Sequence, residues 1–135
     1  GINPLCAVTG LRSGEISQNT AADEMQTKIL EEIMAVVKAK GIKAPKKDMI
    51  TYVKDLSSSR YNKPSMLQHI EAGRLTEIDS LNGALVSEAK ALNISVPFNH
   101  ALVNMVKARE FAMQQLFKQP KVDYEKLERL ALEGK

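Results

Sequence analysis

The sequence is poor in cysteine and aromatic residues, and each scarcity excludes a class of protein. Its one cysteine, Cys6, cannot form an internal disulfide, which is typical of a reducing compartment. Cys6 lies in an apolar stretch, so we expect a buried side chain rather than a nucleophile. Aromatic residues make up only 4% of the chain, the net charge is +3, and acids and bases are mixed. These features are not typical of a nucleic-acid-binding surface.

The chain also lacks a long apolar run. Its longest segment without charge, 91–106, is interrupted by asparagines, a serine, a histidine and a proline. A membrane-spanning helix needs about 20 largely apolar residues, so no membrane partner is expected. No basic segment precedes a long apolar run at the N-terminus, so no secretory leader is recognisable. The sequence therefore predicts a cytoplasmic protein.

Several motifs that carry chemistry are missing as well. No glycine-rich loop is present that could hold a phosphate group. The two histidines, His69 and His100, stand apart from each other and from the cysteine, so no metal site is expected. Nothing specific supports a Ser–His–acid triad. As a catalyst on its own, the chain is incomplete.

What the chain does have is helical periodicity along its whole length. With 135 residues, 44% hydrophobic and 26% charged, it fits one domain with a hydrophobic core. Helices are predicted over 20–40, 47–58, 65–72, 76–92 and 97–119, with a final amphipathic stretch near 124–130. Segment 94–96 alternates too briefly for a strand. The fold class is therefore all-α, an irregular bundle of several helices.

Capping and breaking residues place the helix ends. Thr20 and Thr76 are predicted N-caps, because each is followed three residues later by an aspartate. Gly41 and Gly73 are placed to end helices, and Pro97 suits the first turn of the long one.

The predicted inner faces follow from the spacing of apolar residues. In the helix over 76–92 the inner face reads Ile78, Leu81, Leu85, Ala89 and Leu92, and Gly83 is expected to permit close helix packing. In the long helix it reads Leu102, Met105, Val106, Met113, Leu116 and Phe117.

The segment 63–79 carries a family resemblance. It reads Lys-Pro-Ser-Met-Leu-Gln-His-Ile-Glu-Ala-Gly-Arg-Leu-Thr-Glu-Ile-Asp, and Ser-Leu-Asn-Gly follows directly. These elements, in this order and spacing, resemble the C-terminal domain of the ketopantoate reductase (2-dehydropantoate 2-reductase) family. The match is clear over about 63–110, and Asn3-Pro-Leu adds a shorter match near the start.

The resemblance implies a two-domain enzyme. An N-terminal Rossmann domain, absent from this chain, would bind most of the NADPH, and residues 1–135 would form the helical substrate-side domain. The family reduces 2-dehydropantoate (ketopantoate) to pantoate in pantothenate biosynthesis and needs no metal. The expected partners are thus a small 2-oxo acid and the Rossmann domain, and a homodimer stays open. The chain alone is expected to be inactive.

The resemblance also assigns roles to three residues. Asn3 and Ser65 match residues that bind the substrate, and Glu77 matches a catalytic glutamate that helps to organise cofactor and substrate. The lysine that donates the proton in the family would precede Gly1. His69 departs from the family, which commonly has aspartate there.

Each assignment has a structural alternative. Glu77 follows the predicted cap Thr76, where the helix dipole favours a carboxylate, and Ser65 or Asn3 could serve only as caps. At the level of function, the alternatives are a reductase of another 2-oxo acid and a non-catalytic helical dimerisation module. A serine and a glutamate facing one cleft would favour the enzyme.

Overall fold

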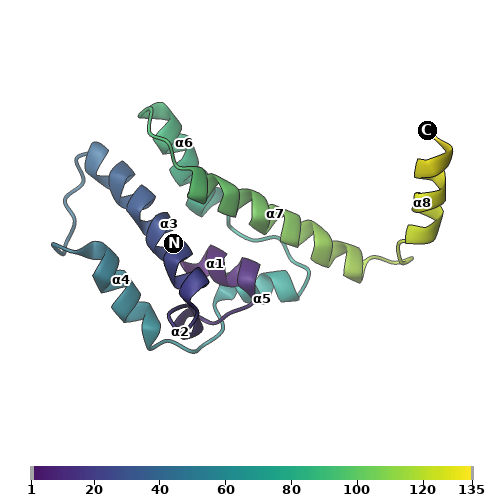
Figure 1. Cartoon of the computed structure of the whole chain (residues 1–135), viewed down its shortest axis with the longest axis horizontal. Helices are drawn as coiled ribbons and strands as arrows, with labels where there is room; N and C mark the ends of the chain where they lie inside the picture. The colour runs from purple at the N-terminus through teal and green to yellow at the C-terminus, as the bar shows by residue number, and fades with distance from the viewer. Residues whose placement is uncertain (1, 135) are drawn as a thin grey trace.

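The structure, a computed structural model, describes residues 2–134. Within this range every regular element is a helix, which confirms the all-α fold (Figure 1). In chain order the elements are α1 (Ile2–Thr9), α2 (Ser13–Ile16), α3 (Thr20–Ala39), α4 (Met49–Ser58), α5 (Ser65–Glu71), the π-helical turn η1 (Asp79–Gly83), α6 (Ala84–Ala91), α7 (Pro97–Phe117) and α8 (Tyr124–Glu133). None of these helices is long and apolar enough to cross a bilayer.

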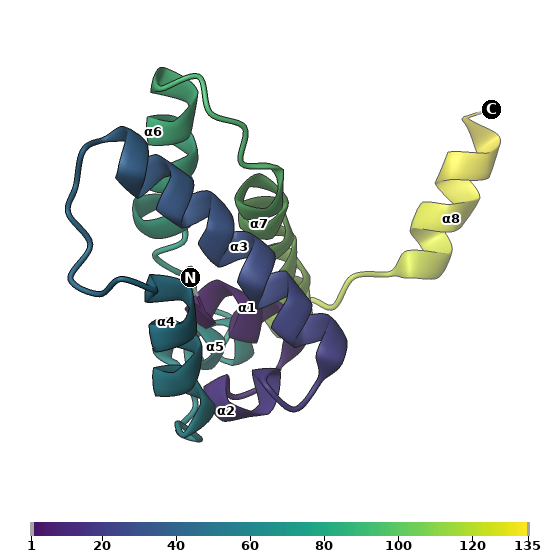
Figure 2. The ribbon, with the colours of Figure 1, turned by 60° about the vertical axis from the view of Figure 1, so that its left-hand side comes forward.

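The short helix α1 lies at the centre of the bundle, between two parts of the hydrophobic core (Figures 1 and 2). Leu5 and Cys6 belong to one cluster, completed by Ile16, Ala22, Ile29 and Leu102. Ala7 belongs to the other, completed by Met66, Ile70, Ile78, Val103 and Val106. Cys6 is buried as predicted, and burial raises the pKa of its thiol because a thiolate would lose its hydration there.

The glycines that end helices were predicted correctly, whereas the cap of α3 was not. Gly41 and Gly73 follow α3 and α5 with φ of +71° and +69°, the left-handed region that favours glycine. Asn19, not Thr20, caps α3: its side chain accepts a hydrogen bond from the Ala22 amide at 3.0 Å. Asparagine is the better cap of the two, and it stands one residue earlier.

The start of α4 differs from the predicted position 47 for a similar reason. The Asp48 carboxylate accepts a hydrogen bond from the Thr51 amide at 3.1 Å, so the helix begins at Met49. That bond lowers the pKa of Asp48, since it stabilises the charged form. Pro97 occupies the first turn of α7 as predicted.

The helix predicted over 76–92 begins with a π turn, which changes its inner face. The Gly83 amide donates to the Ile78 carbonyl, five residues earlier, at 2.9 Å. The extra residue in this turn rotates the side chains that follow. Leu81 is therefore 46% exposed and Asn82 is buried, so the predicted inward position of Leu81 was wrong.

Two residues in this region have other roles than predicted. A Cβ at Gly83 would lie 3.3 Å from the Ile78 carbonyl oxygen, so the glycine relieves crowding within the π turn rather than between helices. Thr76 lies three residues before η1 and is not its cap. Its hydroxyl accepts from the Ile78 amide at 3.3 Å and donates to Glu110 of α7 at 2.6 Å.

Two buried asparagines connect η1, α7 and α3. The Asn82 amide donates to the Asn99 side-chain oxygen at 2.9 Å. Asn99 in turn donates to the Glu32 carboxylate at 2.7 Å and to the Ile29 carbonyl at 3.2 Å. Glu32 also accepts from the backbone amides of Phe98 and Asn99, so α3 supplies the acceptor that begins α7.

Helix α8 lies apart from the bundle, whereas α7 stays in contact with it through Glu110 and Met113 (Figures 1 and 2). Met105, Leu116 and Phe117 were predicted on the inner face of the long helix, but they are 49%, 61% and 59% exposed. The core packs against the side of α7 that carries Leu102, Val103 and Val106, and Met113 packs there as predicted. In α8 the apolar residues Tyr124, Leu127 and Leu130 are all more than half exposed.

Candidate functional site

A hollow of about 530 Å3 lies where α1, α2, α4 and α5 meet the segment 59–64. Residues from both the beginning and the middle of the chain line it: Ile2, Asn3, Ser13, Val53, Leu56, Ser57, Arg60, Asn62, Lys63, Pro64, Ser65 and Gln68. Its position depends on α1, which brings the first residues of the chain against α5.

Asn3 and Ser65, the two predicted substrate-binding residues, both line this hollow. Asn3 lies half-buried in the first turn of α1, and Ser65 is the first, exposed residue of α5. The N-cap of α5 is Pro64, and no side chain caps this helix, so the capping role considered for Ser65 is not observed. The structure thus brings together two polar side chains that are 62 positions apart in sequence.

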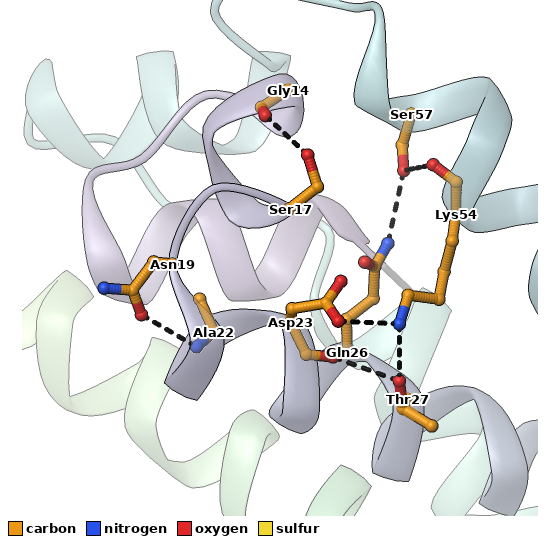
Figure 3. Close-up of polar contacts among 9 residues, drawn as sticks. All are labelled: Gly14, Ser17, Asn19, Ala22, Asp23, Gln26, Thr27, Lys54 and Ser57. Atoms are coloured by element: carbon orange, nitrogen blue, oxygen red, sulfur yellow. Dashed lines mark hydrogen bonds and ion pairs between the residues drawn. The ribbon is translucent and has the colours of Figure 1, made fainter.

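The α4 wall of the hollow is held against α3 by polar contacts (Figure 3). The Lys54 ammonium group contacts the Asp23 carboxylate at 2.9 Å and the Thr27 hydroxyl at 2.8 Å. Three residues further along α4, the Ser57 hydroxyl accepts from the buried Gln26 amide at 3.3 Å. These bonds fix the rotation of α4, and so determine which of its side chains face the hollow.

Glu77, the predicted catalytic residue, does not line the hollow but lies on the same side of α5 as Ser65. Its carboxylate is 3.7 Å from Nδ1 of His69, and its side chain is 39% exposed. His69 is four residues after Ser65, one helical turn along the same face of α5. No side chain makes a capping hydrogen bond to η1, and Glu77 lies two residues before it, so the helix-dipole role stays an alternative for Glu77.

Among the lining residues to which the sequence analysis gave no role are Arg60, Asn62 and Lys63. They directly precede the Pro-Ser pair, and only Lys63 belongs to the stretch that carries the family resemblance. Lys63 forms an ion pair with Glu71 at 2.6 Å. Their closeness to the motif was the one available signal. Their position beside Asn3 depends on packing and could not be inferred from spacing.

The side chains that line the hollow are suited to binding a polar ligand. Amide and hydroxyl groups stand beside two cationic side chains, a set that binds an anionic molecule rich in oxygen. Among residues 2–134 no group of three or more histidine, cysteine or acidic side chains could hold a metal ion.

Comparisons with known proteins identify the family of this chain. Residues 1–110 match the family described as "Ketopantoate reductase PanE/ApbA C terminal". The 2-dehydropantoate 2-reductase of Salmonella typhi is 38% identical over 110 residues, 81% of this chain and 35% of that protein. The Pyrococcus horikoshii enzyme of the same name is 34% identical over 109 residues, 81% of this chain and 36% of that protein. The chain thus spans about a third of the length of these relatives.

Solved structures share the fold. A PanE/ApbA family ketopantoate reductase from Ralstonia eutropha JMP134 superposes with a TM-score of 0.73 at 30% identity, covering 82% of this chain and 37% of that one. D-mandelate dehydrogenase with NADH and anilino(oxo)acetate gives a TM-score of 0.72 at 27% identity, covering 83% of this chain and 38% of that one. Because the family match includes the residues that form the hollow, this chain belongs to the ketopantoate reductase (PanE/ApbA) family and comprises its C-terminal helical region.

Proposed function

We propose that residues 1–135 are the substrate-side domain of an NADPH-dependent 2-dehydropantoate 2-reductase whose N-terminal Rossmann domain lies outside this chain. One observation carries the proposal: Asn3 and Ser65, assigned to substrate binding by family resemblance, line a single hollow. The Glu77 carboxylate lies 3.7 Å from His69, which follows Ser65 by one helical turn on α5. Neither Ser65 nor Glu77 serves as a helix cap, so both side chains are available to a ligand.

The proposed reaction reduces a ketone to a hydroxyl group. A hydride adds to the carbonyl carbon, the electron pair of the C=O bond moves to the oxygen, and the oxygen takes a proton from an acid. The nicotinamide cofactor supplies the hydride when bound. Asn3 and Ser65 would donate hydrogen bonds to the substrate's oxygens and hold its carbonyl group in position. We assign the proton donor to the family's lysine, upstream of this chain.

The part of the chain that the structure describes has no unit that could bind the cofactor's phosphates. Residues 2–134 contain no strand followed by a glycine-rich loop and a helix, the unit that holds a pyrophosphate. We therefore assign the nucleotide mainly to the N-terminal domain. Glu77, at the edge of the site, would contact both substrate and cofactor when the two domains close.

A second candidate is a reductase of another 2-oxo acid. The fold match to D-mandelate dehydrogenase with anilino(oxo)acetate favours it, because that enzyme carries a similar helical domain. Comparing turnover of ketopantoate with that of other branched and aromatic 2-oxo acids would distinguish the two candidates. A non-catalytic dimerisation module would instead show no turnover of any of them.

The decisive variant is Glu77→Gln in the full-length protein. We expect kcat/KM to fall by a factor of about 100 or more, since a positioned carboxylate at a reacting centre contributes about 10²–10⁴. The melting temperature should stay within about 2 °C, because the side chain is 39% exposed and caps no helix. Steady-state kinetics and thermal unfolding of the same preparations would measure both quantities.

Glu24→Gln is the matched control, since Glu24 is exposed on α3 and does not line the hollow. It should leave both kcat/KM and the melting temperature unchanged. If Glu77→Gln lowered stability in proportion to activity, Glu77 would be structural and the catalytic assignment would be lost.

A further inference from the structure

The hollow has an uncompensated positive charge. Arg60 and Lys63 line it, and no aspartate or glutamate does. The charge of Lys63 is already paired, since its ammonium group lies 2.6 Å from the Glu71 carboxylate. No ion pair connects Arg60 to any of residues 2–134, and its side chain is exposed. Arg60 is therefore the cationic group that remains for a ligand in the described part of the site.

The backbone around Arg60 is fixed in place. Its carbonyl oxygen accepts from the Gly14 amide at 2.7 Å, and its own amide donates to the Ser57 carbonyl at 3.1 Å. The next carbonyl, that of Tyr61, accepts from the Arg12 guanidinium at 2.7 Å. A guanidinium group on an anchored backbone loses less freedom on binding, and its planar fork matches a carboxylate.

The α4 wall of the hollow is apolar, in contrast to the cationic segment that carries Arg60. Val53 and Leu56 are three residues apart, on one face of α4, and both line the hollow. Leu56 is 43% exposed, so its apolar surface is available for contact with a ligand. Asn3, Asn62 and Ser65 supply neutral hydrogen-bonding groups between the two walls. The lining thus suits a small molecule with an anionic end and an apolar body.

We propose that Arg60 binds the carboxylate of the ligand and that Val53 and Leu56 bind its branched side chain. Arg60 is then a substrate-binding residue that determines specificity for acids. The inference rests on the proposed function insofar as the ligand is the reductase's own 2-oxo acid. It adds the orientation of that acid in the hollow, with the carboxylate at the segment 59–64 and the side chain at α4.

Arg60→Gln in the full-length protein tests the carboxylate contact. Hydrogen bonds to charged groups contribute about 1.5–3 kcal/mol, so KM for a branched 2-oxo acid should rise about 10- to 100-fold. We expect kcat to change less than threefold and the melting temperature to stay constant. Raising the salt concentration should raise KM of the unmodified protein but affect the variant much less, because the ionic contact has been removed.

Two further variants sharpen the test. Arg129→Gln removes the same charge from α8, which lies apart from the bundle, and should leave KM unchanged (Figure 1). Leu56→Ala should raise KM for 3-methyl-2-oxobutanoate more than for pyruvate, because only the branched acid reaches the α4 wall. An unchanged KM in Arg60→Gln, or a loss of kcat alone, would overturn the inference while leaving the reductase proposal intact.

A binding measurement keeps the two proposals separate. Calorimetric titration of 3-methyl-2-oxobutanoate into the full-length protein, without cofactor, should give at least tenfold weaker binding for Arg60→Gln. If no 2-oxo acid is turned over but this difference is found, the reductase proposal fails and the role of Arg60 stands. If the unmodified protein neither binds nor reduces the acid, both fail.

Discussion

At the scale of single residues, Asn99 is the polar side chain on which the packing of three elements depends. It is fully buried and makes three side-chain hydrogen bonds, to Asn82, Glu32 and the Ile29 carbonyl. Asn99→Ala would leave buried partners unsatisfied. We expect the free energy of unfolding to fall by about 2–3 kcal/mol, since each unsatisfied group costs about 1–3 kcal/mol. Urea denaturation would measure the loss.

The matched control is Asn104→Ala, on an exposed position of the same helix. It should change the free energy of unfolding by less than about 0.5 kcal/mol. Equal losses in the two variants would mean that the buried hydrogen bonds of Asn99 contribute nothing beyond helix propensity.

Some residues that line the hollow could be predicted from the sequence, and others could not. Asn3 and Ser65 were assigned to the substrate by family resemblance, because each belongs to a short motif of that family, and both line the hollow. Arg60 belongs to no motif. Its role depends on the hydrogen bond that joins it to Gly14, 46 positions away, and on the pairing of Lys63 with Glu71. Neither contact follows from periodicity or composition.

At the scale of elements, η1 determines which side chains of its segment face the core, and this can be tested by substitution. Regular α-helical spacing places Leu81 in the core, but the π turn leaves it 46% exposed. Leu81→Gln should therefore change the free energy of unfolding by less than about 0.5 kcal/mol. Ile78→Ala, at a position only 1% exposed in the same segment, should lower it by about 2–5 kcal/mol. Comparable losses in the two variants would indicate a regular helix through this segment.

The contrast shows why helices were predictable and their faces less so. Residues with strong caps or breakers, such as Gly41, Gly73 and Pro97, determine the chain's local geometry, and their predicted roles are confirmed. A π turn inserts one residue without any sequence signal, so Leu81 was wrongly placed on the inner face, whereas Leu85 and Ala89 were placed there correctly. Likewise α2 has only four residues, too few for a periodic pattern.

At the scale of the whole molecule, α8 contributes least to the stability of the fold. It lies apart from the bundle in both views, and all of its residues are exposed (Figures 1 and 2). Deleting residues 118–135 should change the free energy of unfolding of the remainder by less than about 0.5 kcal/mol. Isolated helices of about 10 residues are marginal in water, so amides of α8 should exchange fastest with solvent. Urea denaturation and hydrogen exchange would measure both effects.

A deletion that lowered stability by 2 kcal/mol or more would mean that α8 packs against the bundle in solution. Replacing Leu127 and Leu130 together with serine in the complete chain is the control for that case. The double replacement removes apolar contacts without changing the chain's length.

The dependence of the hollow on Gly14 has a consequence for how this protein could evolve. A Cβ at position 14 would lie 2.7 Å from the Tyr61 ring and 2.9 Å from the Ser58 carbonyl oxygen, so any side chain there would displace the segment that carries Arg60. Gly14 does not itself line the hollow. Adaptation to a new substrate could therefore begin at a position that never meets it, and inspection of the binding surface alone would overlook that route.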